Sequence, residues 1–316
     1  MEAQSNIKLI SFDALSETIN HYYKNGGLTR GLSTGWRKVD EYLLLEKGLL
    51  MVVTGIPSSG KSEFMDQLML QTIILHNWHW TVFSPENWPL EHHFQKLAEK
   101  WIGKPMFHGY NTTEMTQADV ELTCRELSGS IHFINPPEGD STIESLLKGL
   151  LASKEQFDTD AFLLDPWNEL EHNRPNNMSE TEYIGQTLSR LRNFGRRNKV
   201  LMNVVAHPTK LPKGEDGNYP VPTPYDISGS SNWRNKADVC IALWRDYVLN
   251  DDIVQLHIQK VRNKNLGKLG NVNLYWCRGD GLFFDDPADV KYELKHGIRK
   301  IISQVRNDSR DDFLLQ

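Results

Sequence analysis

The sequence predicts an α/β fold: a mostly parallel sheet flanked by helices on both faces and extended by C-terminal antiparallel strands. Two patterns support this prediction. From about residue 32, short apolar runs alternate with segments of helical periodicity, which is typical of parallel strands covered on both faces. After residue 237 the helical segments stop and strand-like runs succeed one another, which predicts a meander that extends the sheet.

The expected strands are runs rich in Val, Ile, Leu and Phe. They lie at 49–54, 81–83, 131–134, 161–165 and 200–206, and then at 239–245, 253–262, 272–276 and 281–285. Helices are expected where apolar residues recur every three or four positions, at 62–76, 90–102, 115–127, 142–154 and 179–197. Because the carboxyl ends of parallel strands meet at one edge of a sheet, polar residues directly after these strands are expected to lie close together.

The chain divides into three predicted parts. Residues 1–30 combine an amphipathic helix at 7–25 with a glycine-rich linker, residues 31–295 form the α/β domain, and residues 296–316 form a charged tail. The helix has an apolar stripe, which either docks on another subunit or folds back on its own domain.

The composition restricts the class of protein. With 316 residues and 39% hydrophobic content the chain can fill a real core, and its net charge of −6 argues against coating nucleic acid by overall attraction. The three cysteines are far apart, which excludes a zinc ribbon or a disulfide framework built from close pairs. No apolar run approaches the roughly 18 residues of a membrane span, and no signal or transit pattern is evident. We therefore expect a cytoplasmic protein that makes no membrane contact.

Residues 55–62 read GIPSSGKS, between an apolar run and an amphipathic one. A glycine, four spacers and Gly-Lys-Ser between a strand and a helix form a Walker A phosphate loop. Its backbone N–H groups wrap phosphates, Lys61 reaches the β and γ oxygens, and Ser62 ligates Mg²⁺. The predicted cofactors are ATP, or another NTP, and Mg²⁺. The predicted nucleotide-binding residues of the loop are Gly55, Pro57, Ser58, Ser59, Gly60, Lys61 and Ser62.

Three further polar residues lie at the end of a predicted strand or shortly after it. Glu86 is the candidate base that orients water, Asp165 is the candidate metal ligand that works with Ser62, and His207 is the candidate γ-phosphate sensor. Each has a structural alternative. Glu86 could simply begin a helix on the surface, Asp165 could cap the next segment, and a lone histidine is often structural.

The order of these motifs resembles the RecA-like core of hexameric replicative helicases of the DnaB type, and especially the helicase half of Twinkle and of phage primase-helicases. The resemblance runs from about Gly31 to Phe284 and includes GLSTGWRKVDEYL, GIPSSGKS, FSPEN, FLLDPW and AHPTK. The most specific match is DISGSSNWRNKADVCIALWR at 226–245, where a Gly-Ser pair, a spaced Asn and Ala-Asp precede a strand. The resemblance implies that Lys61, Glu86, Asp165 and His207 are catalytic.

The resemblance also implies residues that act beyond the loop. Lys260 and Arg262 alternate on a strand and would reach the nucleotide of the neighbouring subunit, with Arg262 as the arginine finger. The alternative is that Arg262 pairs with an acid on a neighbouring strand. Arg245 would lie against the nucleotide base, with either Tyr275 or Trp276 stacked there.

Contacts with single-stranded DNA are expected from two loops. The loop at 209–235 is rich in Gly, Pro and Ser, and the loop at 172–180 comes after the predicted strand that ends at Asp165. Acids at Glu215 and Asp216 leave open the alternative that these are ordinary solvated loops. The predicted DNA-binding residues are Lys210, Lys213, Asn232 and Arg234 in the first loop and Arg174 in the second.

Together these features imply an ATP-dependent DNA helicase with DNA-stimulated ATP hydrolysis. By resemblance it forms a hexameric ring and moves 5′ to 3′ on single-stranded DNA, with a primase and a polymerase as compatible partners. No primase half is present, so the sequence is either a helicase alone or one fragment of a larger protein. Two alternatives remain open, a RecA-type recombinase and an ATP-gated DNA loader or clamp that does not unwind.

Overall fold

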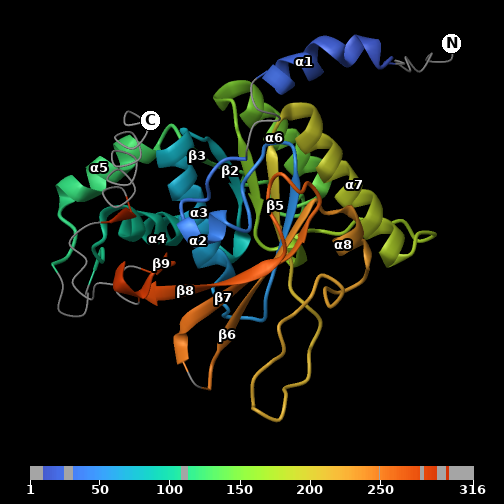
Figure 1. Ribbon diagram of the computed structural model, residues 1–316. Coiled ribbons are helices and arrows are strands. Elements are labelled where there is room, and N and C mark those ends of the chain that lie inside the picture. Colours follow the sequence, from blue (N-terminus) through green and yellow to red (C-terminus); the bar gives the residue numbers. More distant parts are fainter. Residues whose placement is uncertain are drawn as a thin grey trace.

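A single sheet forms the centre of the molecule (Figure 1). The structure is a computed structural model that describes residues 10–24, 31–107, 113–248, 250–277, 281–289 and 297–298. The strand order in the sheet is β3-β2-β4-β5-β1-β6-β7-β8-β9. The strands are β1 Leu50–Thr54, β2 Trp80–Phe83, β3 Ile131–Phe133, β4 Ala161–Leu164, β5 Leu201–Val205, β6 Val239–Asp246, β7 Asn250–Val261, β8 Gly270–Cys277 and β9 Leu282–Phe284.

Strand β1 lies inside the parallel part of the sheet. It pairs in parallel with β5, where Leu50 lies opposite Met202, and with β6, where Met51 lies opposite Val239. Every residue of β1 is buried, because helices cover both faces at this point. The predicted alternation of strands and helices is therefore confirmed, and the phosphate loop comes directly after the interior strand β1.

The C-terminal strands extend the sheet as predicted. Strand β6 is parallel to β1 but antiparallel to β7, and β8 and β9 continue the antiparallel meander. Strand β6 is therefore the seam between the two halves, and it joins the meander directly to the strand that precedes the phosphate loop.

Helices cover both faces of the sheet (Figure 1). Alternate residues of β1 enter the two cores, Met51 and Val53 on one face and Leu50 and Val52 on the other. Helices α3 Lys61–His76, α4 Leu90–Ile102 and α5 Gln117–Leu127 pack on the first face, together with the short helix α2 Arg37–Asp40. Helices α6 Ile143–Phe157, α7 Glu180–Asn198 and α8 Asn232–Lys236 pack on the second.

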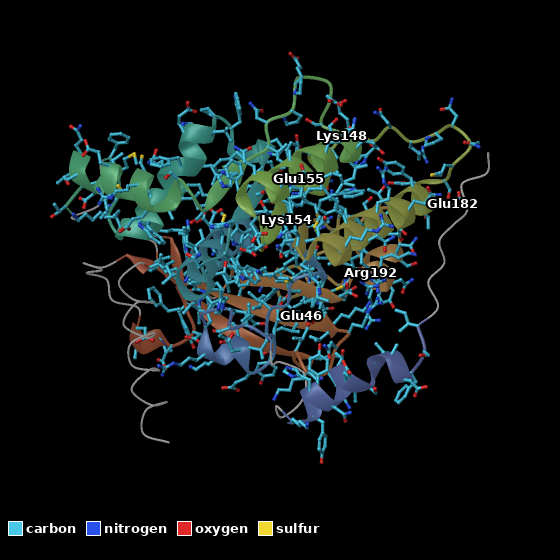
Figure 2. All side chains as sticks on the ribbon, turned by 90° about the horizontal axis from the view of Figure 1, so that it is seen from above. Glu46, Lys148, Lys154, Glu155, Glu182 and Arg192 are labelled. Carbon is cyan, nitrogen blue, oxygen red and sulfur yellow. The ribbon has the colours of Figure 1, made fainter. Side chains whose placement is uncertain are left out.

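The ends and faces of these helices depend on local chemistry. Helix α7 begins at a capping box, in which the Ser179 hydroxyl accepts from the Glu182 backbone and the Glu182 carboxylate accepts from the Ser179 backbone. Charged residues such as Lys148 and Glu155 lie on the exposed side of α6 (Figure 2). Helix α3 differs, because most of its residues are buried between the sheet and its neighbours, so the helix that starts at the phosphate loop is held rigidly.

The predicted N-terminal helix is present in part. Helix α1 spans Ser16–Lys24 after a 3₁₀ turn at Asp13–Leu15, whereas residues 10–12 of the predicted helix are not helical. Residues 7–9 and 25 of the predicted helix, and the linker up to residue 30, lie outside the described residues. Apolar side chains of residues 10–24 are exposed, with Phe12 at 77% and Tyr23 at 86%.

Little of the predicted C-terminal tail belongs to the described residues. Within it, the Gly297 backbone donates to the Ile102 carbonyl at 2.9 Å, and Ile298 is buried, while residues 299–316 lie outside the described part. No helix in the described ranges is long and apolar enough to cross a membrane.

Candidate active site

The phosphate loop connects β1 to α3 at the carboxyl edge of the sheet. Gly60 adopts a φ of +93°, which favours glycine, and Ser58 adopts a φ of 64°, which is uncommon for a residue with a Cβ. A Cβ on Gly55 would lie 2.5 Å from Ser59 Oγ and 2.6 Å from the Leu243 carbonyl oxygen. The loop is therefore tightly wound, and any side chain at Gly55 would force it open.

Lys61 begins α3 and points back across the loop. Its ammonium donates to the carbonyl oxygens of Gly55 at 2.9 Å and Ile56 at 3.1 Å. Burial lowers the pKa of Lys61 to about 8, although Asp165 and Glu86 partly oppose the shift. No ion pair of Lys61 is found in the described part of the chain, so its charge remains available to an anion.

Asp165 comes directly after β4 and faces the start of α3. Its side chain is buried, and its carboxylate accepts a hydrogen bond from Ser62. Burial raises the pKa of Asp165 to about 6, and the nearby Asp66 and Glu86 raise it further. The predicted pair of metal ligands is therefore brought together, in an environment where the charge of Lys61 and the Ser62 hydrogen bond only partly offset the burial of the carboxylate.

Glu86 and His207 meet across the cleft. Glu86 lies in a 3₁₀ turn, Pro85–Asn87, just after β2, and His207 lies just after β5. The His207 Nε2 lies 3.8 Å from Glu86 Oε1. Burial, and next the charge of Lys61, lowers the pKa of His207, so the imidazole is neutral at neutral pH. Glu86 is half exposed, so a water molecule can reach it.

These side chains line one cleft of about 610 Å³. Its size is in the range of small-molecule sites. Sequence reasoning missed three residues of its wall, Glu63, Asn87 and Lys96. The Lys96 ammonium lies 3.0 Å from Glu63 and 3.3 Å from the buried Asp66, and donates to Asn87 Oδ1 at 3.3 Å. Lys96 lies in a helical segment with no motif, so no sequence signal identified it, whereas Asn87 is the residue directly after the candidate base.

The meander closes one end of the cleft. Arg245 on β6 and Trp276 on β8 both line it, and the Arg245 guanidinium lies 4.8 Å from the centre of the Trp276 ring. The sequence left Tyr275 and Trp276 as alternatives. The structure places Trp276, and not Tyr275, at the cleft wall beside Gly60 and Lys61.

The donors and acceptors fit a magnesium nucleoside triphosphate. By helix geometry the first N–H groups of α3 have no intrahelical acceptor, and Lys61, Ser62 and Glu63 of this turn line the cleft. The described residues contain no cluster of three or more His, Cys, Asp or Glu that could hold a metal by itself. A site with one carboxylate and one hydroxyl is what Mg²⁺ needs when phosphates supply further oxygens. Ser62 and Asp165 could therefore hold Mg²⁺ only together with the phosphates.

Most of the chain matches one protein family. The family described as "DnaB-like helicase C terminal domain" matches residues 31–284. The chain belongs to this DnaB-like family. The resemblance inferred from the motifs is therefore confirmed, and the matched range contains the whole cleft.

Two kinds of relative agree with this assignment. The Twinkle homolog protein, chloroplastic/mitochondrial, of Arabidopsis thaliana is 34% identical over 289 residues, which is 89% of this chain and 40% of that protein. The chain thus spans less than half the length of this relative.

A solved structure of an ATPase domain has a TM-score of 0.72 at 17% identity, and the match covers 88% of this chain and 100% of that one. A second, "The Structure Of A DnaB-Like Replicative Helicase And Its Interactions With Primase", has a TM-score of 0.69 at 17% identity, with 86% and 68% covered. These two structural matches support the DnaB-like fold.

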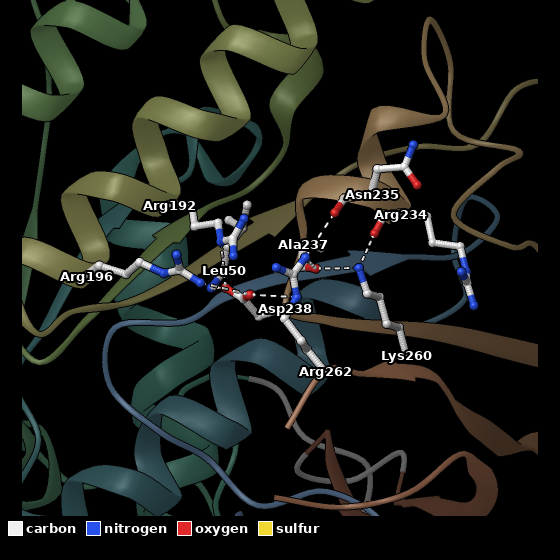
Figure 3. Close-up of polar contacts among 9 residues, drawn as sticks. All are labelled: Leu50, Arg192, Arg196, Arg234, Asn235, Ala237, Asp238, Lys260 and Arg262. Atoms are coloured by element: carbon white, nitrogen blue, oxygen red, sulfur yellow. Dashed lines mark hydrogen bonds and ion pairs between the residues drawn. The ribbon is translucent and has the colours of Figure 1, made fainter. Parts of the chain in front are cut away.

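Lys260 and Arg262, the two residues predicted to act in trans, lie at the amino edge of the sheet, beside the starts of β1 and β6. Both donate to the Ala237 carbonyl, at 2.7 Å and 3.1 Å, so they do point to one place (Figure 3). Arg262 also lies 3.2 Å from Asp238, at the start of β6. The five residues of β1 span about 15 Å between this edge and the phosphate loop. Neither side chain can therefore reach its own Lys61.

The predicted DNA-binding residues do not form one cluster. Lys210 and Lys213 line a pocket of about 650 Å³ next to Ser58 of the phosphate loop, and Lys213 lies 5.1 Å from the centre of the Tyr219 ring. The others lie elsewhere: Arg174 is exposed after β4, Asn232 on α8 donates to the Thr181 carbonyl at 3.1 Å, and Arg234 lies over the ring of Tyr225.

Proposed function

We propose that this chain is an ATP-dependent, ring-forming DNA helicase that moves 5′ to 3′ on single-stranded DNA and unwinds duplex. Membership of the DnaB-like helicase family supports the reaction class. Lys260 and Arg262 lie at the edge of the sheet opposite Lys61, and this separation is the observation that supports the ring and on which the proposal rests.

Each copy holds only part of the proposed site. Lys61, Glu86, Asp165 and His207 lie at the carboxyl edge, whereas Lys260 and Arg262 lie about 15 Å away at the amino edge. An arginine that contributes to nucleotide hydrolysis from that edge must do so in another copy. Hydrolysis then alters a contact between subunits, and six such contacts close a ring.

The residues of the cleft divide the chemistry among them. Bound ATP would supply the phosphates and Mg²⁺ would neutralise their charge, with Ser62 and Asp165 as its ligands. Lys61 holds the phosphates, Glu86 orients the attacking water, and neutral His207 can donate a hydrogen bond that depends on the terminal phosphate.

DNA contacts are proposed for Lys210 and Lys213, which lie beside the phosphate loop, and for Asn232, Arg234 and Arg174 on other loops. Sparse cations in one copy become a continuous ring of charge in six, which offsets the acidic net charge of the chain. A primase and a polymerase stay predicted partners, and the cytoplasmic location stays a prediction, since the Arabidopsis relative is named as chloroplastic/mitochondrial.

The decisive experiment is ATP-dependent unwinding of a duplex that offers either a 5′ tail or a 3′ tail for loading. We expect unwinding of the 5′-tailed substrate and none of the 3′-tailed one. Lys61→Ala removes the cation that holds the phosphates and should abolish unwinding of both.

Hydrolysis stimulated by DNA without unwinding of either substrate would contradict the helicase assignment. Filaments in micrographs would then identify a recombinase, and turnover indifferent to DNA would identify a loader or clamp.

A further inference from the structure

Arg262, at the end of β7, is one of three arginines within ion-pair distance of Asp238. Two more arginines reach the same carboxylate from α7, Arg192 with Nε at 3.3 Å and Arg196 with a terminal nitrogen at 3.5 Å (Figure 3). The Leu50 backbone N–H donates to Asp238 Oδ2 at 3.1 Å. One buried carboxylate thus fixes guanidinium groups that come from two different elements.

The charges in this cluster do not balance. Lys260 adds a fourth cation, and its acceptors within the described ranges are the backbone carbonyls of Arg234 and Ala237. Among the described residues, Asp238 is the one carboxylate within ion-pair distance of the three arginines. Three positive charges are therefore uncompensated, in a chain whose net charge is −6.

Asp238 and Arg192 of the cluster are largely buried, whereas Arg196 and Arg262 form an exposed rim. The Asp238 side chain is 2% exposed and that of Arg192 is 17% exposed, whereas those of Arg196 and Arg262 are 49% and 40% exposed. The two outer guanidinium groups can meet a partner while the inner carboxylate keeps them in place. One guanidinium group can donate two hydrogen bonds to the oxygens of a phosphate. An anion with several phosphates is therefore the ligand that suits the two arginines of this rim.

We propose that Arg196 is a further cation supplied in trans, which together with Arg262 binds the terminal phosphates of a nucleotide held by a neighbouring copy. Asp238 and Arg192 are positioning residues that orient the pair. This inference rests on the proposed function, because it needs the neighbour's phosphate loop. It adds a residue on α7 to the residues that act in trans, which otherwise come from the end of β7.

The test compares Arg196→Gln with Arg197→Gln. Arg197 is the next residue of α7 and is also exposed, but it makes no ion pair with Asp238. We expect Arg196→Gln to lower kcat for ATP by about ten- to a hundredfold with little change in KM, because one donor to the developing charge is lost. Arg197→Gln should behave as the parent protein does, and Arg196→Lys should restore part of the rate.

Mixed rings distinguish a trans role from a structural one. An Arg196→Gln copy has an intact phosphate loop, and a Lys61→Ala copy has an intact arginine cluster, so their shared interface is complete. Co-expression of the two should therefore give turnover above the sum of the separate variants. A variant damaged only within its own fold would show no such gain.

The outcomes separate this inference from the proposed function. The same mixing is done with Arg262→Gln, which tests the shared site itself. A gain with Arg262→Gln but none with Arg196→Gln overturns the trans role of Arg196 and keeps the ring. No gain with either variant overturns both. Equal losses in Arg196→Gln and Arg197→Gln also overturn the inference, because they would indicate a general effect of charge on α7.

Discussion

The two edges of the sheet differ in how their charges balance. At the carboxyl edge, the acids Asp165, Glu86 and Glu63 share the cleft with as many cations, Lys61, Lys96 and Arg245. At the amino edge, four cations surround the carboxylate of Asp238. The first edge has acids to hold a metal and a loop to hold phosphates, whereas the cluster around Asp238 has an excess of cations. Each edge supplies what the other lacks, which is the arrangement expected of a site shared between identical copies.

The strongest test of this complementarity is Arg262→Gln. We expect ATP turnover to fall by about a thousandfold or more, the range known for arginine fingers, while nucleotide binding by the same chain is nearly unchanged. Asp238 would keep Arg192 and Arg196 as partners, so the fold should persist. Phosphate release and equilibrium nucleotide binding measure the two effects. Lys264→Gln, in the exposed loop after β7, is the matched control and should leave both unchanged.

A somewhat smaller loss is expected from Glu86→Gln at the carboxyl edge. The amide keeps the shape of the side chain but cannot accept a proton, so turnover should fall by about a hundredfold or more. Nucleotide binding should persist, because Glu86 is half exposed and Lys61, which holds the phosphates, is positioned by the Gly55 and Ile56 carbonyls. Glu91→Gln, in the exposed first turn of α4, should retain full turnover. Equal turnover in the two variants would remove Glu86 from the reaction.

Binding of the magnesium nucleotide should weaken at acidic pH, because Asp165 gains a proton. Because burial raises the pKa of this carboxyl to about 6, it is charged at pH 7 and gains a proton below pH 6. A protonated carboxyl is a poor magnesium ligand, so affinity for the magnesium nucleotide should fall by about tenfold for each pH unit below 6.

The nucleotide itself complicates that measurement, since its terminal phosphate titrates with a pKa of about 6. Asp165→Asn corrects for this, because the variant keeps the phosphate titration and lacks the carboxylate. Binding curves from pH 5 to pH 8 should differ in slope between the parent and the variant. Parallel curves would show that Asp165 does not ligate the metal.

The motif residues were predictable from sequence because their positions depend on the chain's local order. Glu86, Asp165 and His207 each come just after a short apolar strand, and the residues after parallel strands emerge at one edge of the sheet. The order of strands and helices was enough to place these three near Lys61. The neighbours β2, β4, β5 and β1 then bring them into one cleft.

Residues that act through tertiary packing were not predictable in the same way. Lys96 reaches the cleft because α4 packs on α3, and Arg192 and Arg196 reach Asp238 because α7 lies over the start of β1. A helical pattern specifies which side of a helix is buried, but it does not specify which carboxylate an arginine will meet. The net charge of −6 also gave no sign of the cationic cluster, because it is a sum over the sequence and does not show where charges gather in the fold.

The smallest expected effect concerns the wall of the cleft, where the sequence left Tyr275 and Trp276 as alternatives. Trp276 lies under the Arg245 guanidinium and beside the phosphate loop, so its ring can stack on a nucleotide base. Trp276→Ala should weaken nucleotide binding by about 1 kcal/mol, roughly fivefold, and leave kcat almost unchanged. Tyr275→Phe is the control, since Tyr275 does not line the cleft. A base contact should also make the loss larger for ATP than for inorganic tripolyphosphate, which has no base. Equal losses for both ligands would mean that Trp276 supports the loop and does not touch the base.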